Sequence, residues 1–497
     1  MTTGGLFTLV QNDGRQDKML MATSLLNRRL KEIRRMRCRN PAIKDTTPTL
    51  VDIEKTHIMF MNAHFKPFAA MSYEYDRIGA QEGLPQFGST VSFSIPQFGD
   101  FFADMCVHIV LEGFTATVSG DQVQYCEYLG HRFMKNVEFE VNRNILDEYD
   151  SDVYNFHYNF AVPEHKRTNW LRNVGQEVPK KAILTQNLGV DPYREQKWIL
   201  DGPQTPKTSH PSVEMWIPLL FWFNKDPRLA IPSVSIPYGQ RYITIEIAQL
   251  AEVCFGINNG GGGAFIPPRI ATFELFINNL FVNPEIHDIF IKRVGFSLIR
   301  VHKFERRGLS ANQDSILLDN LRWPVETLYF GVRPTVNTAP PASQANWHRF
   351  HISADFLVPY PVAVPNPAPP PNDQLAFSDA VYKTEVPILN TAGFRIREIE
   401  LYREFPVGFY NSYIPYTYGG EHVGSPDDPG MYIATFNLYP GSYQPSGHIN
   451  LSQSREFYIV YTSNFITPLF TANLFIVAIC INFLLITDGG AVLRYNT

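Results

Sequence analysis

Hydrophobic and polar residues alternate in short runs along the chain, and residues 212–247 combine several of these runs. The stretch starts with a bulky apolar segment, Met215–Phe223, which is short and contains Pro218, so a helix is not expected there. Further prolines follow at positions 227, 232 and 237. From Ile243 to Ile247 every second residue is isoleucine, as on a strand with one buried face. The stretch predicts a strand, a proline-braced corner and a second strand in the inner wall of a β-sandwich.

The same alternation recurs on both sides of this stretch. In the first half it appears in VSFSI (91–95), VEFEV (137–141) and part of FELFINNLFV (273–282). In the second half, strands are expected at GFSLIRVHKF (295–304), FGVRP (330–334), FRIREIELY (394–402), MYIATFNLY (431–439) and REFYIVY (455–461). Turns or loops are expected at Gly99–Asp100, at Gly120–Asp121 and at residues 258–263. The pattern is typical of an all-β protein.

The length of the chain and one repeated feature indicate two similar domains. A chain of 497 residues is expected to divide into about two to four domains. The aromatic share of 13% suits strands, and the 37 prolines suit the loops between them. An Ile-Pro-Tyr sequence precedes an alternating strand twice, at residues 236–238 and at 414–416, which suggests that one sandwich has been duplicated. A short helical segment, PEIHDIFIKR (284–293), marks the expected boundary.

Charge, cysteines and hydropathy exclude several classes of protein. The net charge of −5 argues against a nucleic-acid-binding protein, which needs a basic face. The five cysteines are scattered, so neither a disulfide framework nor a zinc site is expected, and a reducing compartment fits best. The longest apolar run, Leu474–Ile486, holds 13 residues, fewer than the ~20 of a membrane span, and the segment around it predicts two strands that turn at residues 488–490. With no signal-peptide pattern at its start, the chain is expected to be soluble.

The first 50 residues predict an N-terminal arm that contains a basic amphipathic helix. Ser24 is a suitable cap, and Leu26, Leu30, Ile33 and Met36 have helical spacing. The other faces carry Arg28, Arg29, Lys31, Arg34, Arg35 and Arg37. Three interpretations remain open: a solvated helix packed on its own domain, a helix that touches an anionic membrane or an acidic partner, and a contact with nucleic acid.

No pattern of residues predicts catalysis, a cofactor or a metal. The chain contains no GxSxG elbow, P-loop, HExxH or GxGxxG sequence. His57, His64 and His131 lie beside strands and are interpreted as hydrogen-bonded structural residues. Asp427 and Asp428 could bind calcium, but their place between prolines favours a turn. The proline run at 358–373 is expected to be extended and exposed, because prolines lack amide donors.

Several long segments resemble the double jelly-roll major capsid proteins of nucleocytoplasmic large DNA viruses, those of asfarviruses in particular. They follow the same order over nearly the whole chain: THIMFMNAHFKPF (56–68), IPQFGDFFADM (95–105), YCEYLGHRFMKNVEFEVNRNILDEYDSD (125–152), DGPQTPK (201–207), FWFNKDPRLAIPSVSIPYGQRYITIEI (221–247), ELFINNLFVNPEIHDIFIKRVGFSLIRVHK (274–303), NSYIPYTYGG (411–420), SPDDPG (425–430), YQPSGHINLSQSREFYI (443–459) and INFLLITDGGAVLRY (481–495). The loops at 113–125 and 178–201 are shorter than in the asfarvirus pattern.

The resemblance implies two tandem eight-stranded jelly rolls, with short helices in loops, in residues 51–290 and 291–497, after an arm at 1–50. It also implies a non-enzymatic shell protein without cofactors. Three copies would form a six-sided capsomer of an icosahedral virion assembled in the host cytoplasm, without direct contact to nucleic acid. The basic helix would face minor capsid proteins or an inner membrane. The alternatives are a double jelly-roll scaffold that leaves the mature particle, and a carbohydrate-binding or hydrolytic β-sandwich.

Overall fold

The computed structural model describes most of the chain in two compact units. The described residues are Arg28, Lys31, Glu32, Arg35 and 71–183, 196–233, 236, 240–258, 262–282, 296–338, 346–362, 376–453, 456–487 and 490–494. One unit comprises Met1–Glu74 with Asn279–Arg293, and the other Tyr75–Asn278 with Val294–Thr497. The expected boundary helix at 284–293 lies outside the described residues. The larger unit contains the fold described below, except for residues 71–74 of the first strand and 279–282 of the strand paired with it.

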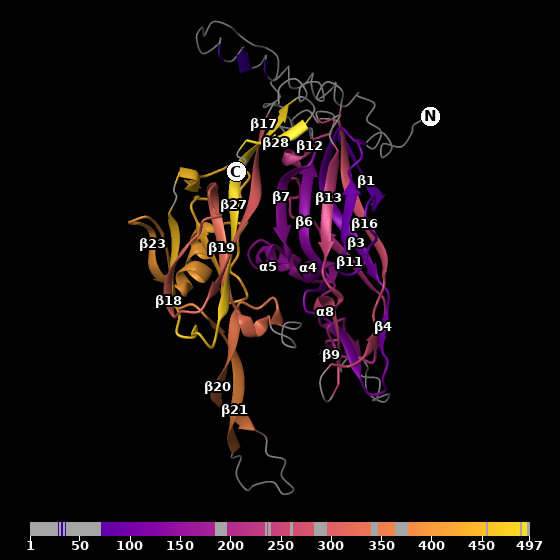
Figure 1. The fold of residues 1–497 in the computed structure, drawn as a ribbon, viewed down its shortest axis with the longest axis vertical. Helices are drawn as coiled ribbons and strands as arrows, with labels where there is room; N and C mark the ends of the chain where they lie inside the picture. Colours follow the sequence, from indigo (N-terminus) through magenta and orange to yellow (C-terminus); the bar gives the residue numbers. More distant parts are fainter. Residues whose placement is uncertain are drawn as a thin grey trace, which may run out of the picture. The chain divides into compact units, whose positions relative to one another are not determined.

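The first half of the chain forms a sandwich of two sheets (Figure 1). Phe93 and Phe273, from opposite sheets, have ring centroids 5.3 Å apart, so the sheets pack through aromatic side chains. In the first sheet the order is β1 (Met71–Gly79), β16 (Ile270–Val282), β3 (Phe101–Leu111) and β11 (Val213–Pro218), with β12 (Ile231–Pro232) also paired to β3. In the second sheet it is β2 (Thr90–Ser94), β13 (Arg241–Ile247), β6 (Met134–Val141) and β7 (Asn144–Asp150).

The second half forms another sandwich of the same kind. Phe330 and Phe394 pack between its sheets, with ring centroids 5.3 Å apart. One sheet has the order β17 (Phe296–Leu309), β27 (Ala472–Thr487), β19 (Pro324–Pro334) and β24 (Met431–Thr435), with β25 (Ile449–Asn450) paired to β19 and β28 (Gly490–Leu493) to β27. The other has the order β18 (Gln313–Leu317), β26 (Phe457–Thr462), β22 (Thr391–Ile396) and β23 (Ile399–Pro406).

The two sandwiches have the same topology. When the eight main strands of each are numbered in chain order, both have one sheet in the order 1-8-3-6 and another in the order 2-7-4-5. This is the strand order of a jelly roll, in which consecutive strands lie in alternate sheets except for strands 4 and 5, which are neighbours in one sheet. The predicted pair of eight-stranded jelly rolls is therefore confirmed, and the equal strand order supports the duplication inferred from the sequence.

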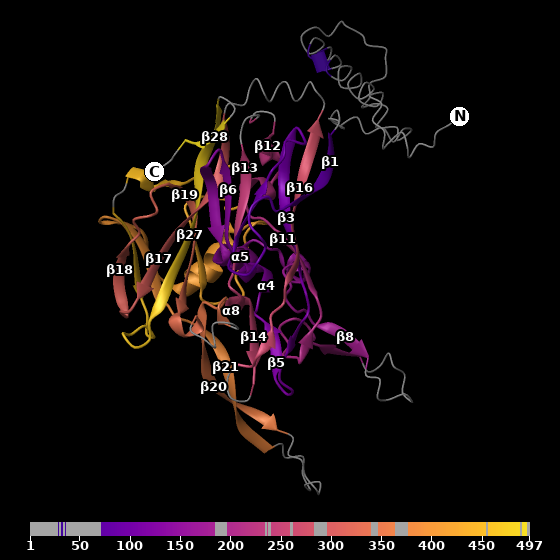
Figure 2. The same ribbon diagram turned by 45° about the vertical axis from the view of Figure 1, so that its right-hand side comes forward.

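The jelly rolls differ in what connects their strands. Between strands 3 and 4 the first carries β4 (Phe114–Ala116), β5 (Gln122–Tyr125) and α4 (Leu129–Phe133), and the second η2 (Thr335–Asn337) and a hairpin of β20 (His351–Val362) and β21 (Ala376–Pro387). Between strands 5 and 6 the first carries α5 (Ser151–Phe160), α6 (Glu164–Asn173), β8 (Lys180–Ile183), β9 (Gln196–Ile199) and β10 (Ser209–His210), and the second η3 (Phe409–Tyr413) and α11 (Ile414–Tyr418). Short pieces elsewhere are α7 (Trp222–Lys225), η1 (Pro227–Leu229), α8 (Leu250–Val253), β14 (Cys254–Ile257), β15 (Phe265–Ile266) and η4 (Leu451–Gln453). The β20–β21 hairpin extends away from its jelly roll (Figure 2).

Most strand predictions are confirmed, and two local ones need correction. The apolar segment from Met215 forms strand β11 as far as Pro218, but its end turns into helix α7 at Trp222, where no helix was expected. This turn brings the rings of Phe221, Trp222 and Phe223 to within 5.3–5.8 Å of Phe139. Packing against Phe139 thus overrides the local preference for a strand.

The second correction concerns the prolines. Residues 358–362 of the proline run are extended, as predicted, but they belong to strand β20, which pairs with β21, while 363–375 lie outside the described residues. The second Ile-Pro-Tyr sequence lies in helix α11 rather than in an extended corner, because proline is tolerated in the first turn of a helix. The two strands predicted around residues 488–490 are β27 and β28.

Replacing Phe139 by alanine is expected to lower the free energy of unfolding by about 3–5 kcal/mol, because it leaves a cavity among four aromatic rings. Urea unfolding followed by tryptophan fluorescence measures the change. The matched control is Phe98→Ala, since the Phe98 side chain is 65% exposed and its loss should change stability by less than about 0.5 kcal/mol. Equal effects of the two substitutions would contradict this account of the core.

Candidate functional site: the contact between the two jelly rolls

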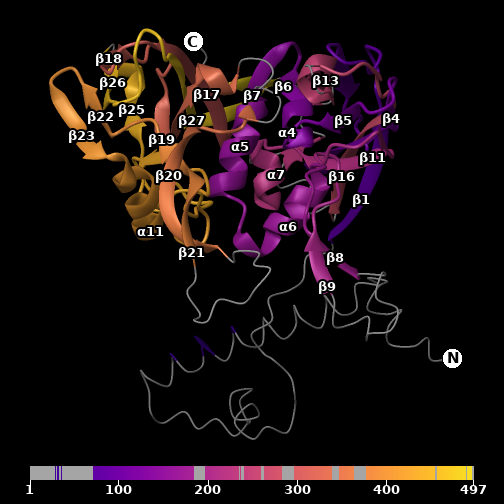
Figure 3. The ribbon, with the colours of Figure 1, turned by 90° about the horizontal axis from the view of Figure 1, so that it is seen from below.

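Helix α5 of the first jelly roll is the central element of the contact with the second (Figure 3). The helix begins where β7 ends, because the Asp150 carboxylate accepts hydrogen bonds from the amides of Asp152 (3.0 Å) and Val153 (3.3 Å). Eight of its ten residues are buried, on faces that point to both jelly rolls. A short helix buried on both sides is stabilised mainly by tertiary packing, so α5 depends on the second jelly roll for its cover.

Aromatic rings form the apolar part of this contact. Phe156 lies 6.2 Å from the ring of Tyr329 on β19 and 5.3 Å from Phe350, measured between centroids. Phe160, one turn further along, lies 5.2 Å from Tyr329. On the other side of α5, the Tyr154 hydroxyl lies 3.3 Å from that of Tyr149 in the first jelly roll. One helix thus joins two cores.

Three carboxylates at the end of β7 and the start of α5 pair with basic side chains of the second jelly roll. The Asp147 carboxylate accepts a hydrogen bond from the His302 amide at 2.8 Å, and its other oxygen lies 3.0 Å from His302 Nδ1. Asp152 pairs with Arg333, and both side chains are less than a tenth exposed. Arg306 pairs with Asp150 and lies 4.0 Å from the Asp152 carboxylate. Buried charges require such partners, so these pairs fix the orientation of one jelly roll on the other.

The far end of α5 is held by polar contacts to the turn at residues 425–430. The Asn159 side-chain oxygen accepts hydrogen bonds from the amides of Asp427 (3.0 Å) and Asp428 (3.3 Å). Arg167 donates to both carboxylate oxygens of Asp427 at 2.6 Å. The Asp428 carboxylate accepts from the amides of Phe350 and Gly430, each at 2.8 Å. The predicted turn is confirmed, and its two aspartates contact protein groups.

A third set of contacts surrounds α4. The Trp347 indole nitrogen donates to the Glu127 carbonyl at 2.7 Å, and the Arg132 guanidinium lies 5.0 Å from the Trp347 ring. His131 is fully buried: its Nδ1 lies 3.2 Å from Asn155 Oδ1, and its Nε2 accepts from the Trp170 indole at 2.9 Å. The prediction of a structural histidine at this position is confirmed; His57 and His64 lie outside the described residues.

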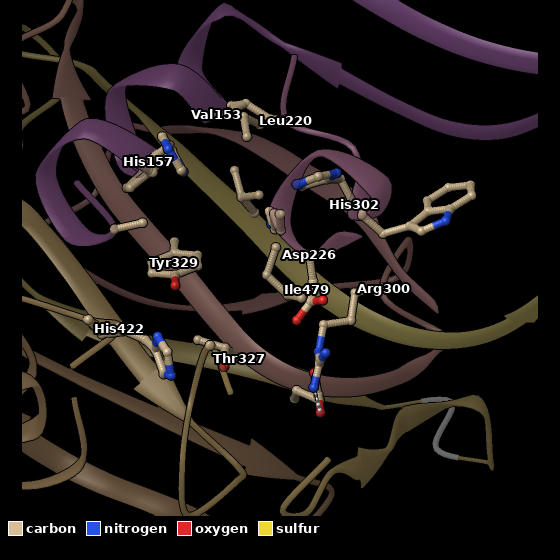
Figure 4. A pocket seen from close by; sticks show the side chains of 18 of the residues that line it. Val153, His157, Leu220, Asp226, Arg300, His302, Thr327, Tyr329, His422 and Ile479 are labelled. Carbon is tan, nitrogen blue, oxygen red and sulfur yellow. Dashed lines mark hydrogen bonds and ion pairs between the residues drawn. The ribbon is translucent and has the colours of Figure 1, made fainter. Parts of the chain in front are cut away.

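A cavity of about 420 Å³ lies in the contact between α5 and the second jelly roll (Figure 4). The first jelly roll lines it with Val153, His157 and Leu220, and the second with residues that include Arg300 and Tyr329. Arg300 is held by Glu326 at 2.5 Å. Among the described residues, no group of three or more His, Cys, Asp and Glu side chains is placed to hold a metal ion.

Burial lowers the pKa of three histidines of this region. Desolvation lowers the pKa of His131 from 6.5 to about 3, although the hydrogen bond to Asn155 opposes the shift. The pKa of His157 is likewise lowered to about 3 by burial and by nearby Lys225. The pKa of His348, whose ring centroid lies 4.7 Å from that of Tyr128, falls well below its usual value for the same main reason.

The residues predicted from the sequence as a partner-binding site lie in the smaller unit. Arg28, Lys31 and Arg35 are exposed and helical, as the predicted helix requires, and Arg28 lies 3.9 Å from Glu32. Arg29, Arg34 and Arg37 lie outside the described residues. The charged contact of Asp147, Asp152, Arg306 and Arg333 was not predicted from the sequence. The available signal was the acidic run ILDEYDSD (145–152), whose aspartates precede a helix but whose partners lie about 150 residues or more away.

Comparisons with known proteins place this fold among viral capsid proteins. Residues 64–270 match the family "Major capsid protein N-terminus", and residues 281–492 match "Large eukaryotic DNA virus major capsid protein". The hexon protein p72 of African swine fever virus (strain Badajoz 1971 Vero-adapted) is 34% identical over the full length of both chains. The chain therefore belongs to the major capsid proteins of large eukaryotic DNA viruses. It is a structural component of the virion shell, as the resemblance implied.

Solved structures agree with this assignment. The Faustovirus major capsid protein has 34% sequence identity and a TM-score of 0.75, with 96% of this chain and 100% of that chain covered. A chain of the PBCV-1 virus capsid has 19% identity and a TM-score of 0.61, with 88% and 100% covered, which shows a shared fold. Among the described residues, no helix is both long and apolar enough to cross a membrane.

Removing the guanidinium in Arg333→Met is expected to lower the free energy of unfolding by about 3–5 kcal/mol, because Asp152 then remains buried without a partner. Urea or thermal unfolding measures the loss. The matched control is Arg403→Met: its partner Glu400 lies at 3.3 Å, but the two side chains are 83% and 59% exposed, so a change within about 1 kcal/mol is expected. A loss at Arg333 no larger than the control's would show that the ion pair does not hold the contact.

Stability is also expected to fall as the pH drops from about 6.5 towards 3. In that window the unfolded chain binds protons on His131 and His157, whereas the folded chain excludes them, so stability is complete above pH 6.5 and lost below it. Each histidine should contribute a slope of up to about 1.4 kcal/mol per pH unit. The test is urea unfolding at several pH values with His157→Asn, which should flatten the slope. His165→Asn, at an exposed position, should leave it unchanged; equal slopes in all three proteins would contradict the assignment.

Proposed function

We propose that this chain self-assembles as a homotrimer with a six-sided outline, and that these capsomers tile an icosahedral shell. The observation that supports the proposal is the equal strand order of two jelly rolls joined by a buried contact. Three copies of such a pair present six similar sandwiches around one axis, and closed cyclic symmetry is the usual way to complete such a ring. Apolar burial between chains would drive assembly, with polar rims setting the angles between capsomers.

The same proposal assigns a role to each part of the chain. Residues 51–290 and 291–497 act as the two jelly-roll units, and residues 1–50 as an arm directed towards minor capsid proteins or an inner membrane. The exposed, helical positions of Arg28, Lys31 and Arg35 support an anionic partner for the arm. The relatives are structural shell proteins, so we assign the chain no catalytic step and no cofactor. We also propose that it assembles in the host cytoplasm.

Purified protein should have the mass of three chains by light scattering and should show six-sided particles by electron microscopy. The same chain should be among the most abundant proteins of purified virions by mass spectrometry. A trimer that is absent from virions would favour a transient scaffold instead. A protein that stays monomeric under all solution conditions would refute the proposed assembly.

A further inference from the structure

The first sheets of the two jelly rolls differ in the exposure of their outer faces. On β19 of the second jelly roll, ten of eleven residues are buried, so this strand is covered on both faces. On β3, which has the same place in the first jelly roll, buried residues alternate with half-buried ones from Ala103 to Leu111. Along neighbouring β11 the alternation is between buried and exposed side chains up to Ile217. The difference arises because α5 lies over β19, as Phe156, Phe160 and Asp152 show.

The outer face of the first jelly roll carries an aromatic cluster. Its position corresponds to the place that α5 covers on the second jelly roll. Trp216 stacks on His108 with centroids 4.0 Å apart, and the ring of Phe276 lies 5.1 Å from Trp216. Trp216 is 37% exposed although it is the centre of this cluster. Glu214 and Glu274 lie beside it, at 2.9 and 3.8 Å from the His108 ring nitrogens. Tryptophan is enriched among the residues that contribute most to protein–protein binding.

The second jelly roll carries its own counterpart of α5, and this segment exposes tyrosines. Like α5, the segment η3–α11 follows the fifth strand of its sandwich. Tyr410 and Ile414 are buried and anchor it. Tyr413, Tyr416 and Tyr418 are exposed, with exposed fractions of 51%, 88% and 38%. Three neighbouring exposed tyrosines form an apolar surface with hydroxyl groups at its edge, a composition enriched at interfaces.

We propose that the tyrosine surface (Tyr413, Tyr416 and Tyr418) of one chain covers the tryptophan face (His108, Trp216 and Phe276) of a second copy. The contact repeats, between chains, the arrangement that α5 makes within one chain, where the helix after the fifth strand covers the first sheet of the next jelly roll. This inference rests on the proposed trimer. Because each chain carries both surfaces, the contact is head-to-tail, and three such contacts close a ring.

The chemistry of the two surfaces is complementary. Tyrosine rings can pack on Trp216 and Phe276, and their hydroxyl groups can donate hydrogen bonds to Glu214 and Glu274. Within the chain, the equivalent contact adds buried ion pairs such as Asp152 with Arg333 to its aromatic packing. These ion pairs allow the contact within a chain and the contact between chains to form without exchanging partners.

A mixing experiment tests the proposal. One variant, Tyr413→Glu/Tyr416→Glu, loses the tyrosine surface and keeps the tryptophan face; the other, Trp216→Glu, loses the tryptophan face and keeps the tyrosines. Each is expected to be monomeric by light scattering at concentrations where the parent is a trimer. Mixed in equal amounts, they should form a one-to-one dimer, because one intact contact remains between them. The control Trp198→Glu, at a tryptophan 66% exposed on β9, should remain trimeric.

The outcomes separate this inference from the proposed function. If the parent is a trimer and either variant also remains one, the assigned surfaces are wrong although the trimer stands. If both variants are monomeric but do not pair when mixed, the two surfaces are not partners. A monomeric parent overturns both proposals. Circular dichroism and melting temperature confirm that the variants fold, as the exposure of the substituted rings leads us to expect.

A second measurement avoids substitutions on the tryptophan face. A photo-crosslinking amino acid at position 416 in an otherwise unchanged chain should form crosslinks to peptides of β3, β11 or β16 after illumination. A mixture of isotope-labelled and unlabelled chains shows whether each crosslink joins two copies. Crosslinks that stay within one chain, or that reach other surfaces of the neighbour, would overturn the proposal.

Discussion

The fold depends on the burial of helix α5 between two sandwiches that would otherwise be separate. The helix carries apolar rings towards both cores and carboxylates at its start. Its burial is favourable only if every charge finds a partner, and Arg333, Arg306 and His302 supply these from three places on the opposing sheet. In this contact, apolar packing supplies stability and the paired charges fix the orientation of one jelly roll on the other. The two similar domains are therefore joined by a specific contact.

The sequence predicts the architecture well because sandwich strands leave a local signal. Alternation in residues 243–247 marks strand β13, whose burial alternates in the structure. The long apolar run after residue 473 is also predicted as strand, since it is too short for a membrane span and ends in a glycine turn. Where local and tertiary preferences differ, the prediction fails: Trp222 begins a helical turn because its ring packs against Phe139.

The site is harder to predict than the fold because its partners are far apart along the chain. Asp147 and Asp152 are visible as an acidic start of a helix, but nothing local to them indicates Arg333 or His302. The predicted basic helix has the opposite character, because its charge pattern is entirely local to residues 24–37. The proposed tyrosine surface shows the same difficulty, since Tyr416 is notable only when the equivalent helix in the first jelly roll is known to be buried.

The position of β27 has a consequence for how the protein is made. This strand, the last of the sixteen main strands, pairs with β17 and β19 in the middle of its sheet, so the second sandwich stays incomplete until the ribosome has translated almost all of it. The first sandwich can form much earlier, with Phe156 and Phe160 of α5 still facing water. During synthesis each nascent chain therefore exposes the apolar rings of α5. On a polysome, several such chains lie close together. Until the second sandwich covers it, this helix is a surface through which unfinished chains can aggregate.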